Sequence, residues 1–361
     1  MYQEGKAAIK HYSKAFLNPE ARLSRDLSVA FIAVNAEKGA SVLDSTAATG
    51  IRAIRYALET KAKDVTLLEI NESAYRDAVK NLKSNGVKAK ALQKSIQEYT
   101  NTTTKRFDII DHDPFGSIAP NLYDLMKVAK SNGFLLLTAT DTAVLCGAQE
   151  KACRRIYDAK PLHNELCHEV GARILAGYVA RTAGQFNFGI KVLLTISYAH
   201  YMRLFIQLQH GAEKSGNSVK QMGYAYYCSK CTYHGCLPSV FPRLAECPEC
   251  GARLDVAGKL WAGEIYDKKI AREMRDYMVE KGFDKSGVKV LSTIMQEPDS
   301  ALYYSIPKLT KKLGMPSVSP SKVIERLGEM GYSAWTTHFD NSSVRTDAPV
   351  SKVKEALNRG A

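Results

Sequence analysis

The sequence predicts an α/β fold in which a doubly wound parallel sheet is followed by a smaller α+β part. Three observations support this prediction. Over the first 210 residues, short apolar runs alternate with amphipathic helical stretches. Two Cys-x-x-Cys pairs follow, and a tail of short helices and a hairpin pattern closes the chain. Apolar strands that alternate with helices indicate a parallel sheet with helices on both faces.

Each element rests on periodicity and end signals. The first helix is expected to begin near Ser24, and the helix over 73–86 takes Ser73 as its cap and Gly86 just past its end. The expected strands are 40–45, 64–71, 89–95, 107–114, 133–141, 191–200 and 201–209; further helices are expected over 48–60, 165–183, 289–296, 305–314 and 320–331.

Changes in composition suggest the domain boundaries. Residues 211–218 have the Gly- and Ser-rich composition of a linker. The predicted division is a first domain over 1–210, a linker over 211–222, a Cys-rich module over 223–258 and an α+β domain over 259–361. The last has three helices and a hairpin around Asp340, Asn341 and Ser342, a winged-helix pattern that serves either nucleic-acid binding or packing.

Charge and composition narrow the class of protein. Of 361 residues, 50 are Lys or Arg and 37 are Asp or Glu, so the formal net charge is +13. The excess is spread over the chain, which suits a long polyanion but also fits an ordinary basic enzyme. No apolar run is long enough to span a membrane, and the start has no secretory signal pattern. Eight cysteines without a disulfide pattern favour a reducing cytoplasm.

The first strand-to-helix turn predicts a nucleoside cofactor. The turn from Asp44 to Gly50 is made of small residues but lacks the glycine pattern that admits a pyrophosphate. Glu69 ends the next strand about 20 residues further on, where a carboxylate accepts ribose hydroxyls. An adenosine site without a pyrophosphate loop points to S-adenosylmethionine. The alternative is a bare turn with a solvated glutamate.

A second motif follows the strand over 107–114. Asp113-Pro114-Phe115 offers a carboxylate, a carbonyl and an aromatic ring, which suit methylation of an exocyclic amine on a base. The two acceptors orient the N–H groups, the carboxylate can take the released proton, and the ring stacks on the base. His112 is expected to face the other way and pack. The alternative is a plain Pro-Phe-Gly turn.

The four paired cysteines predict a structural zinc site. Cys228, Cys231, Cys247 and Cys250 have the spacing of a closed zinc ribbon, whereas a redox Cys-x-x-Cys has one pair at the start of a helix. Cys236 and His234 are less favoured ligands. Tyrosines nearby either cover the ribbon or stack on bases. The scattered Cys146, Cys153, Cys167 and Cys236 are interpreted as small apolar side chains.

Together these motifs resemble the archaeal-type tRNA guanine-26 N2-dimethyltransferase family along nearly the whole chain. The matching blocks are Asn18-Pro19, Arg25-Asp26, Leu43-Asp44, Ala48-Thr-Gly-Ile-Arg52, Asp113-Pro-Phe-Gly-Ser117, Thr138-Ala-Thr-Asp141, Leu145-Cys-Gly-Ala148, Glu165-Leu-Cys-His-Glu-Val-Gly171, Thr337-His-Phe339 and Thr346-Asp-Ala-Pro349.

The resemblance implies a Rossmann-like class I S-adenosylmethionine methyltransferase domain, with tRNA as its substrate, that adds one and then two methyl groups to guanine 26. The zinc prediction rests on the cysteine spacing. The resemblance implies cofactor contacts for Arg25, Arg52, Glu69, Ser95 and Ile96, and catalytic roles for Asp113 and Phe115. The small-residue turn adds Asp44 and Gly50 to the expected cofactor contacts, and the carbonyl of the second motif adds Pro114 to the catalytic residues. Arg55 is expected to be a structural ion-pair partner. Two rival functions remain: an amino-methyltransferase for DNA adenine or ribosomal RNA guanine, and a non-catalytic zinc-ribbon binding protein.

Overall fold

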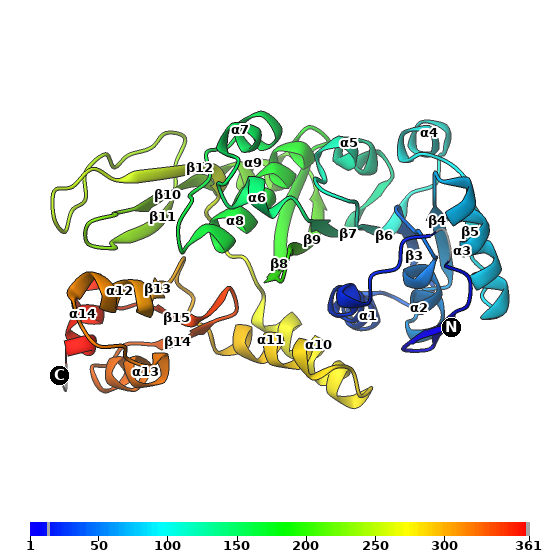
Figure 1. Cartoon of the computed structure of the whole chain (residues 1–361). Coiled ribbons are helices and arrows are strands. Elements are labelled where there is room, and N and C mark those ends of the chain that lie inside the picture. Colours follow the sequence, from blue (N-terminus) through cyan, green and yellow to red (C-terminus); the bar gives the residue numbers. More distant parts are fainter. Residues whose placement is uncertain (13–14, 359–361) are drawn as a thin grey trace.

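A seven-stranded sheet lies at the centre of the computed structural model, which describes residues 1–12 and 15–358 (Figure 1). The strand order is β5-β4-β3-β6-β7-β9-β8. Strands β3 to β7 run parallel, and β9 pairs antiparallel with both β7 and β8. The predicted α/β class is therefore confirmed. The strands are β3 (Ser41–Asp44), β4 (Asp64–Leu68), β5 (Lys90–Leu92), β6 (Phe107–His112), β7 (Ala129–Ala139), β8 (Phe188–Tyr198) and β9 (Tyr201–His210).

Helices connect and cover these strands, and a small N-terminal hairpin precedes them. The predicted cap of the helix after β4 is wrong: Asn71 caps it by accepting a hydrogen bond from the Ala74 amide, and Ser73 lies inside. The N-terminal elements are β1 (Tyr2–Glu4), β2 (Ala7–Ile9) and the 3₁₀ helix Pro19–Ala21; the helices are α1 (Arg22–Asn35), α2 (Ile51–Glu59), α3 (Glu72–Ser84), α4 (Ile96–Thr102), α5 (Ala119–Lys127), α6 (Thr142–Leu145), α7 (Glu150–Tyr157) and α8 (Cys167–Gly184).

The segment expected to be a linker, 211–222, contains a helix, α9 (Ala212–Lys220), that packs on β8 and α8. Its Ser218 hydroxyl accepts a hydrogen bond from the Ile190 amide of β8. The main hydrophobic core also continues past residue 210, because Leu260, Met274 and Leu291 belong to it. The four-part division of the chain stays a prediction.

The cysteine-rich module is a three-stranded antiparallel sheet, with β11 (His234–Pro238), β10 (Met222–Tyr227) and β12 (Asp255–Trp261) in that order. Its last strand lies against α8 at Gly177. A Cβ on Gly177 would come within 2.9 Å of the Trp261 amide nitrogen, so only glycine permits this close approach. The module therefore packs directly on α8 through β12.

The C-terminal part contains α10 (Lys268–Glu280), α11 (Lys285–Gln296), β13 (Tyr304–Ser305), α12 (Ile306–Leu313), α13 (Pro320–Glu329), β14 (Ala334–Thr337), β15 (Asp340–Thr346) and α14 (Val350–Asn358). The caps of α13 are as predicted: Ser319 accepts from the Lys322 amide, and Gly331 follows the helix with φ +86°. The hairpin turn is not, because residues 340–342 belong to β15 and the chain reverses at 338–339.

The winged-helix pattern also has a different third helix. The helix expected over 289–296 forms part of α11, whose buried Leu291 and Ile294 join the main core. A second core instead joins α12, α13 and β15 to α14, a helix that the sequence analysis missed. Within the described residues, every helix falls short of the length and apolar character that a membrane crossing requires.

Candidate active site

A cavity of about 760 Å³ opens at the carboxyl edge of the parallel strands. Its walls come from the turns after β3, β4, β5 and β6, from the start of α1 and from the β8–β9 turn. This edge is where an open α/β sheet binds its ligand. The predicted Arg25, Arg52, Glu69, Ser95, Ile96, Asp113, Pro114 and Phe115 all line the cavity.

Glu69 anchors the cofactor half of this cavity. Its Oε2 accepts a hydrogen bond from the Ala48 amide at 2.8 Å, and its Oε1 accepts from the Asn71 amide at 2.8 Å. These bonds fix the carboxylate across the small-residue turn 45–49, and each oxygen keeps a lone pair for a ribose hydroxyl. The residues present therefore fit an adenosine group.

Asp44 and Gly50 are not among the residues that line the cavity, and their contact with the cofactor stays a prediction. Gly50 takes φ +77° at the start of α2 and packs on Ala78. The Asp44 carboxylate is fully buried, and both of its oxygens lack a hydrogen-bond partner among the described residues. Burial and the neighbouring Asp111 raise the pKa of Asp44 to about 7.

The other predicted cofactor residues have partners within the chain. Arg25 donates from Nε and Nη2 to Glu4, at 2.7 and 2.6 Å, although it also lines the cavity. The Ser95 hydroxyl caps α4 by accepting from the Glu98 amide, and Ile96 follows it in the wall. Both residues therefore shape the cavity through elements of the fold.

Asp113 lies at the cavity, where one arginine contacts it and the charge of a second acts on it. Its side chain is 24% exposed, and its Oδ2 forms an ion pair with the Arg52 Nη2. The Thr138 hydroxyl, which lines the same cavity, accepts a hydrogen bond from Arg203. Burial opposes ionisation, but Arg52 and Arg203 outweigh it and lower the pKa of Asp113 to about 2. The carboxyl is thus ionised at neutral pH.

Sequence reasoning missed Arg203 and Asp111. Arg203 lies fully buried on β9 and donates from Nη2 to Asp111 Oδ2 at 2.6 Å and to Ser28 Oγ at 2.7 Å. The sequence did contain one sign that Arg203 matters: it is the single charged residue in the apolar run YMRLFIQLQ. A charged residue in a central strand needs a buried partner. Its partner could not be chosen from the sequence.

Phe16 is the other residue that the sequence analysis missed. Its ring meets Phe115 edge-on, with centroids 4.7 Å apart and planes at 76°. Both rings are exposed, by 56% and 76%, at the mouth of the cavity. The segment that carries Phe16 precedes the first helix and shows no periodic pattern that would mark it.

Two side chains near the motifs have the packing roles that were predicted. His112 is fully buried with its Nδ1 2.9 Å from the Ser45 hydroxyl, and burial lowers its pKa to about 4. Arg55 is buried among Glu4, Asp26 and Glu59, with which it forms ion pairs. Neither residue lines the cavity.

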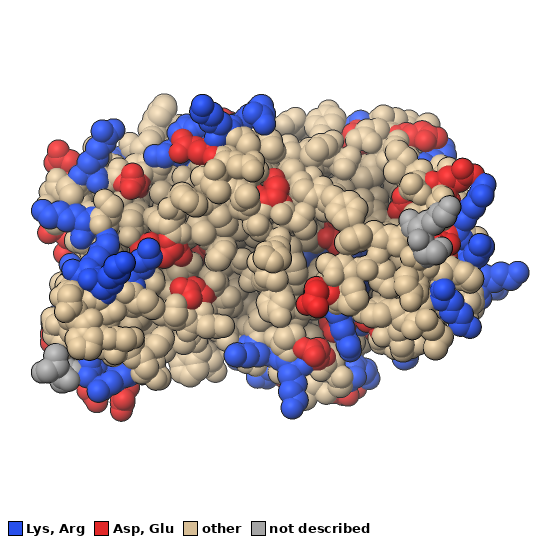
Figure 2. Space-filling view, viewed as in Figure 1, with Lys and Arg blue, Asp and Glu red and all other residues tan. Residues whose placement is uncertain are grey.

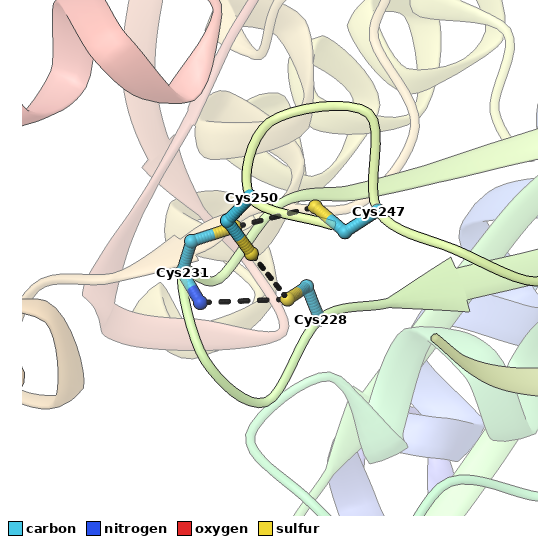
Figure 3. A group of neighbouring side chains, drawn as sticks. All are labelled: Cys228, Cys231, Cys247 and Cys250. Atoms are coloured by element: carbon cyan, nitrogen blue, oxygen red, sulfur yellow. Dashed lines mark hydrogen bonds between the residues drawn. The ribbon is translucent and has the colours of Figure 1, made fainter. Parts of the chain in front are cut away.

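The four predicted zinc ligands come together at one end of the β10 sheet (Figure 3). The Sγ atoms of Cys228 and Cys250 are 3.6 Å apart, and those of Cys231 and Cys247 are 3.4 Å apart. A tetrahedral zinc with Zn–S bonds of about 2.3 Å separates its sulfurs by roughly 3.8 Å. The cluster therefore fits a closed structural zinc, and Tyr226 packs on it.

Three features define a Rossmann-like S-adenosylmethionine-dependent methyltransferase. They are the strand order, the turn after β3 that lacks a pyrophosphate-binding glycine pattern, and the cavity beside Asp113. Comparison with known proteins gives the particular family. The chain belongs to the family described as N2,N2-dimethylguanosine tRNA methyltransferase, whose model matches residues 2–358.

Relatives of known name cover nearly the full length. A tRNA (guanine(26)-N(2))-dimethyltransferase from Methanothermobacter thermautotrophicus is 35% identical, over 95% of this chain and 92% of its own. One of the same name from Pyrococcus furiosus is 35% identical, over 98% and 95%. The solved structure of Trm1 from Pyrococcus horikoshii with S-adenosyl-L-methionine has a TM-score of 0.91 at 34% identity and covers 99% of both chains.

Proposed function

We propose that this enzyme transfers methyl groups from S-adenosylmethionine to N2 of guanine 26 in tRNA, first one and then a second. The observation that carries this proposal is the ionised Asp113 beside the exposed ring of Phe115, at a cavity whose far side holds Glu69. Family membership and the names of the relatives support the substrate. We propose the cytoplasm as the place where it acts, since a tRNA substrate is available there.

Asp113 and the Pro114 carbonyl orient the amine. S-adenosylmethionine, when bound, supplies an electrophilic methyl group. The N2 lone pair of guanine is delocalised into the base, so the amine must be held by acceptors on its N–H groups to expose that lone pair. An ionised carboxylate is a strong acceptor, and it stabilises the positive charge that develops on nitrogen.

Asp113 can also take the proton that methylation releases. A carboxyl with a pKa of about 2 is a weak base. The alkylated, positively charged exocyclic nitrogen is nevertheless a far stronger acid, so proton transfer to Asp113 is downhill. After the first methyl group one N–H remains for Asp113 to hold, which permits the second transfer.

Phe115 and Phe16 provide the stacking surface for the base. Guanine in a helical stem is inaccessible, so it must leave the stack to enter the cavity. The two rings contact each other at the mouth of the cavity. We propose that the base stacks on Phe115 and that Phe16 covers its other face, with each contact worth about 1–3 kcal/mol.

The tRNA is proposed to bind by its phosphates to basic side chains on more than one domain. Figure 2 shows Lys and Arg side chains distributed toward the edges of this face, over both ends of the molecule, with acidic side chains among them. Such a distribution favours many separate phosphate contacts, so affinity should fall steeply with salt.

The decisive experiment is methyl transfer into an unmodified tRNA transcript, compared with the same transcript carrying adenine in place of guanine 26. We expect dimethylguanosine in the first and no methylated nucleoside in the second, measured by digestion and mass spectrometry. Equal labelling of the two transcripts would show that guanine 26 is not the nucleotide that is methylated. Labelling of DNA or ribosomal RNA, with the tRNA left unmodified, would overturn the substrate.

A further inference from the structure

A second group of soft ligands lies away from the ribbon. The thiols of Cys146 and Cys167 and the imidazole of His168 place one donor atom each within 4.8 Å of the others. Cys146 follows the end of α6, and Cys167 and His168 are the first two residues of α8. The fold therefore joins side chains that stand about 20 positions apart in the sequence.

The surroundings of these residues differ from those of a cysteine that only packs. Cys153 lies on α7 between them in sequence and is fully buried in the main core. Cys146, Cys167 and His168 are each partly exposed, so an ion from solvent can reach them. None of the three lines the cavity or belongs to the ribbon cluster. The methyl-transfer chemistry does not use them.

We propose that Cys146, Cys167 and His168 form a second metal site, for a zinc-type divalent ion, with a fourth position open to water. Two thiolates and one imidazole are a donor set typical of zinc. Tetrahedral zinc brings such donors to roughly 3.3–3.8 Å from one another. The observed limit of 4.8 Å is close enough for side-chain rotations to complete the site.

The backbone around the cluster is already ordered by hydrogen bonds. The Cys146 amide donates to Thr142 O at 2.7 Å, and the Cys167 amide donates to Asn164 O at 3.1 Å. His163 places Nδ1 3.1 Å from the Cys146 carbonyl oxygen, so its ring lies beside the site. Supports of this kind orient ligands before a metal arrives.

An ion at this place would tie the catalytic loop to α8. The Thr140 amide donates to Gly116 O at 2.9 Å, and the Gly116 amide donates to the Thr140 hydroxyl at 2.7 Å. Thr140 leads directly into α6 and Cys146, while α8 carries Glu169, which pairs with Arg345 of the C-terminal domain. The proposed ion would therefore fasten α6 against the helix that holds the two domains together.

Metal stoichiometry tests the proposal without any activity assay. The full chain would be stripped with a chelator under reducing, oxygen-free conditions and titrated with Co²⁺, with thiolate-to-cobalt absorption as the readout. We expect two equivalents for the native chain, one for the Cys146→Ser, Cys167→Ser double variant, and two for the matched control Cys153→Ser.

Two further arms separate this site from the ribbon. The Cys228→Ser, Cys231→Ser variant should keep one equivalent, with weaker charge-transfer absorption because the remaining site has two thiolates. If that variant fails to fold, the native chain compared with Cys146→Ser, Cys167→Ser decides alone. One equivalent in the native chain would overturn the proposal, as would a second equivalent that survives the Cys146→Ser, Cys167→Ser change. A reversible Cys146–Cys167 disulfide without a second equivalent would make the pair a redox couple instead.

Discussion

Two clusters of buried charges in this molecule differ in what surrounds them. Beside the cavity, Arg52 and Arg203 hold Asp111 and Asp113. Between α8 and the C-terminal domain, Arg345 pairs with Glu169 and Glu297, each at 2.6 Å. His338 joins the second cluster through Glu297 at 2.5 Å and through the Thr195 carbonyl oxygen at 3.0 Å.

The pKa values alone do not distinguish the two clusters. Burial is outweighed by arginines at both places, and the pKa is lowered to about 2 for Asp113 and for Glu169 alike. The two clusters differ in whether their carboxylate oxygens remain free to bind a ligand. The Arg345–Glu169 pair is fully enclosed, whereas Asp113 is 24% exposed to the cavity and Asp111 Oδ1 has no partner among the described residues. A perturbed carboxyl becomes a functional candidate only where a ligand can reach it.

The enclosed cluster should determine stability. Replacing Arg345 by Met leaves Glu169 and Glu297 buried without their shared cation, so the free energy of unfolding should fall by about 3–5 kcal/mol. Urea unfolding measures this change. Methyl transfer per folded molecule should change little. The exposed pair Arg76–Glu72 provides the control, because Arg76→Met should cost less than about 1 kcal/mol. Equal losses in both variants would contradict the comparison.

The cluster beside the cavity should determine rate. Replacing Asp113 by Asn keeps the shape but removes the ionised acceptor, so kcat should fall by about 10²–10³-fold, which corresponds to roughly 2.7–4 kcal/mol. The measurement is single-turnover methyl transfer into tRNA at saturating cofactor, expressed per folded molecule. Asp113→Asn should also lose stability at neutral pH, because the lowered pKa means that the ionised carboxylate stabilises the folded chain. A variant of native rate would remove Asp113 from the mechanism.

Ionisation of Asp44 should destabilise the folded chain, whereas ionisation of Asp113 and Glu169 stabilises it. The folded pKa of about 7 for Asp44 lies above the unfolded value of about 3.9, so ionisation penalises the folded chain. Without cofactor, Asp44→Asn should therefore gain stability over the native chain as pH rises from 4 to 7, by about 2–4 kcal/mol, and the gain should level off above pH 7.

Urea unfolding at pH 5 and pH 8 measures this difference. Asp108 is the matched control, because hydrogen bonds from Lys130 and Ser41 outweigh its burial and lower its pKa. Asp108→Asn should lose stability at both pH values. A pH-independent difference for Asp44→Asn would show that the buried carboxyl does not titrate in this range.

The smallest effect is expected for Phe16, which contacts Phe115 at the mouth of the cavity. Phe16→Ala should raise KM for tRNA by about 5- to 160-fold, since a stacking contact is worth about 1–3 kcal/mol, and it should leave the melting temperature unchanged because the ring is exposed. Phe241→Ala removes a more exposed ring that does not line the cavity, and it should leave KM near native. A matching rise in both variants would indicate a general loss of RNA contact.

Local sequence patterns were enough to predict the parallel sheet, the zinc ribbon and the Asp113-Pro114-Phe115 part of the active site. The alternation of strands and helices, the spacing of Cys228, Cys231, Cys247 and Cys250, and the run Asp113-Pro114-Phe115 all lie within short stretches of chain. Burial in an α/β sheet and tetrahedral coordination impose these spacings directly. The sequence by itself therefore determined the fold class, the zinc ligands and the edge of the sheet that carries the site.

Only the tertiary structure decided which distant residues meet there. Arg203 of β9 reaches Asp111 of β6 across the intervening β7, Phe16 reaches Phe115 from the N-terminal segment, and Cys146 meets Cys167 at the start of α8. The helix α14 likewise forms because neighbouring elements bury its apolar face, whereas α9 is joined to β8 through the buried Ser218 hydroxyl. Contacts between residues far apart in sequence depend on the packing of whole elements, and no local pattern records that packing.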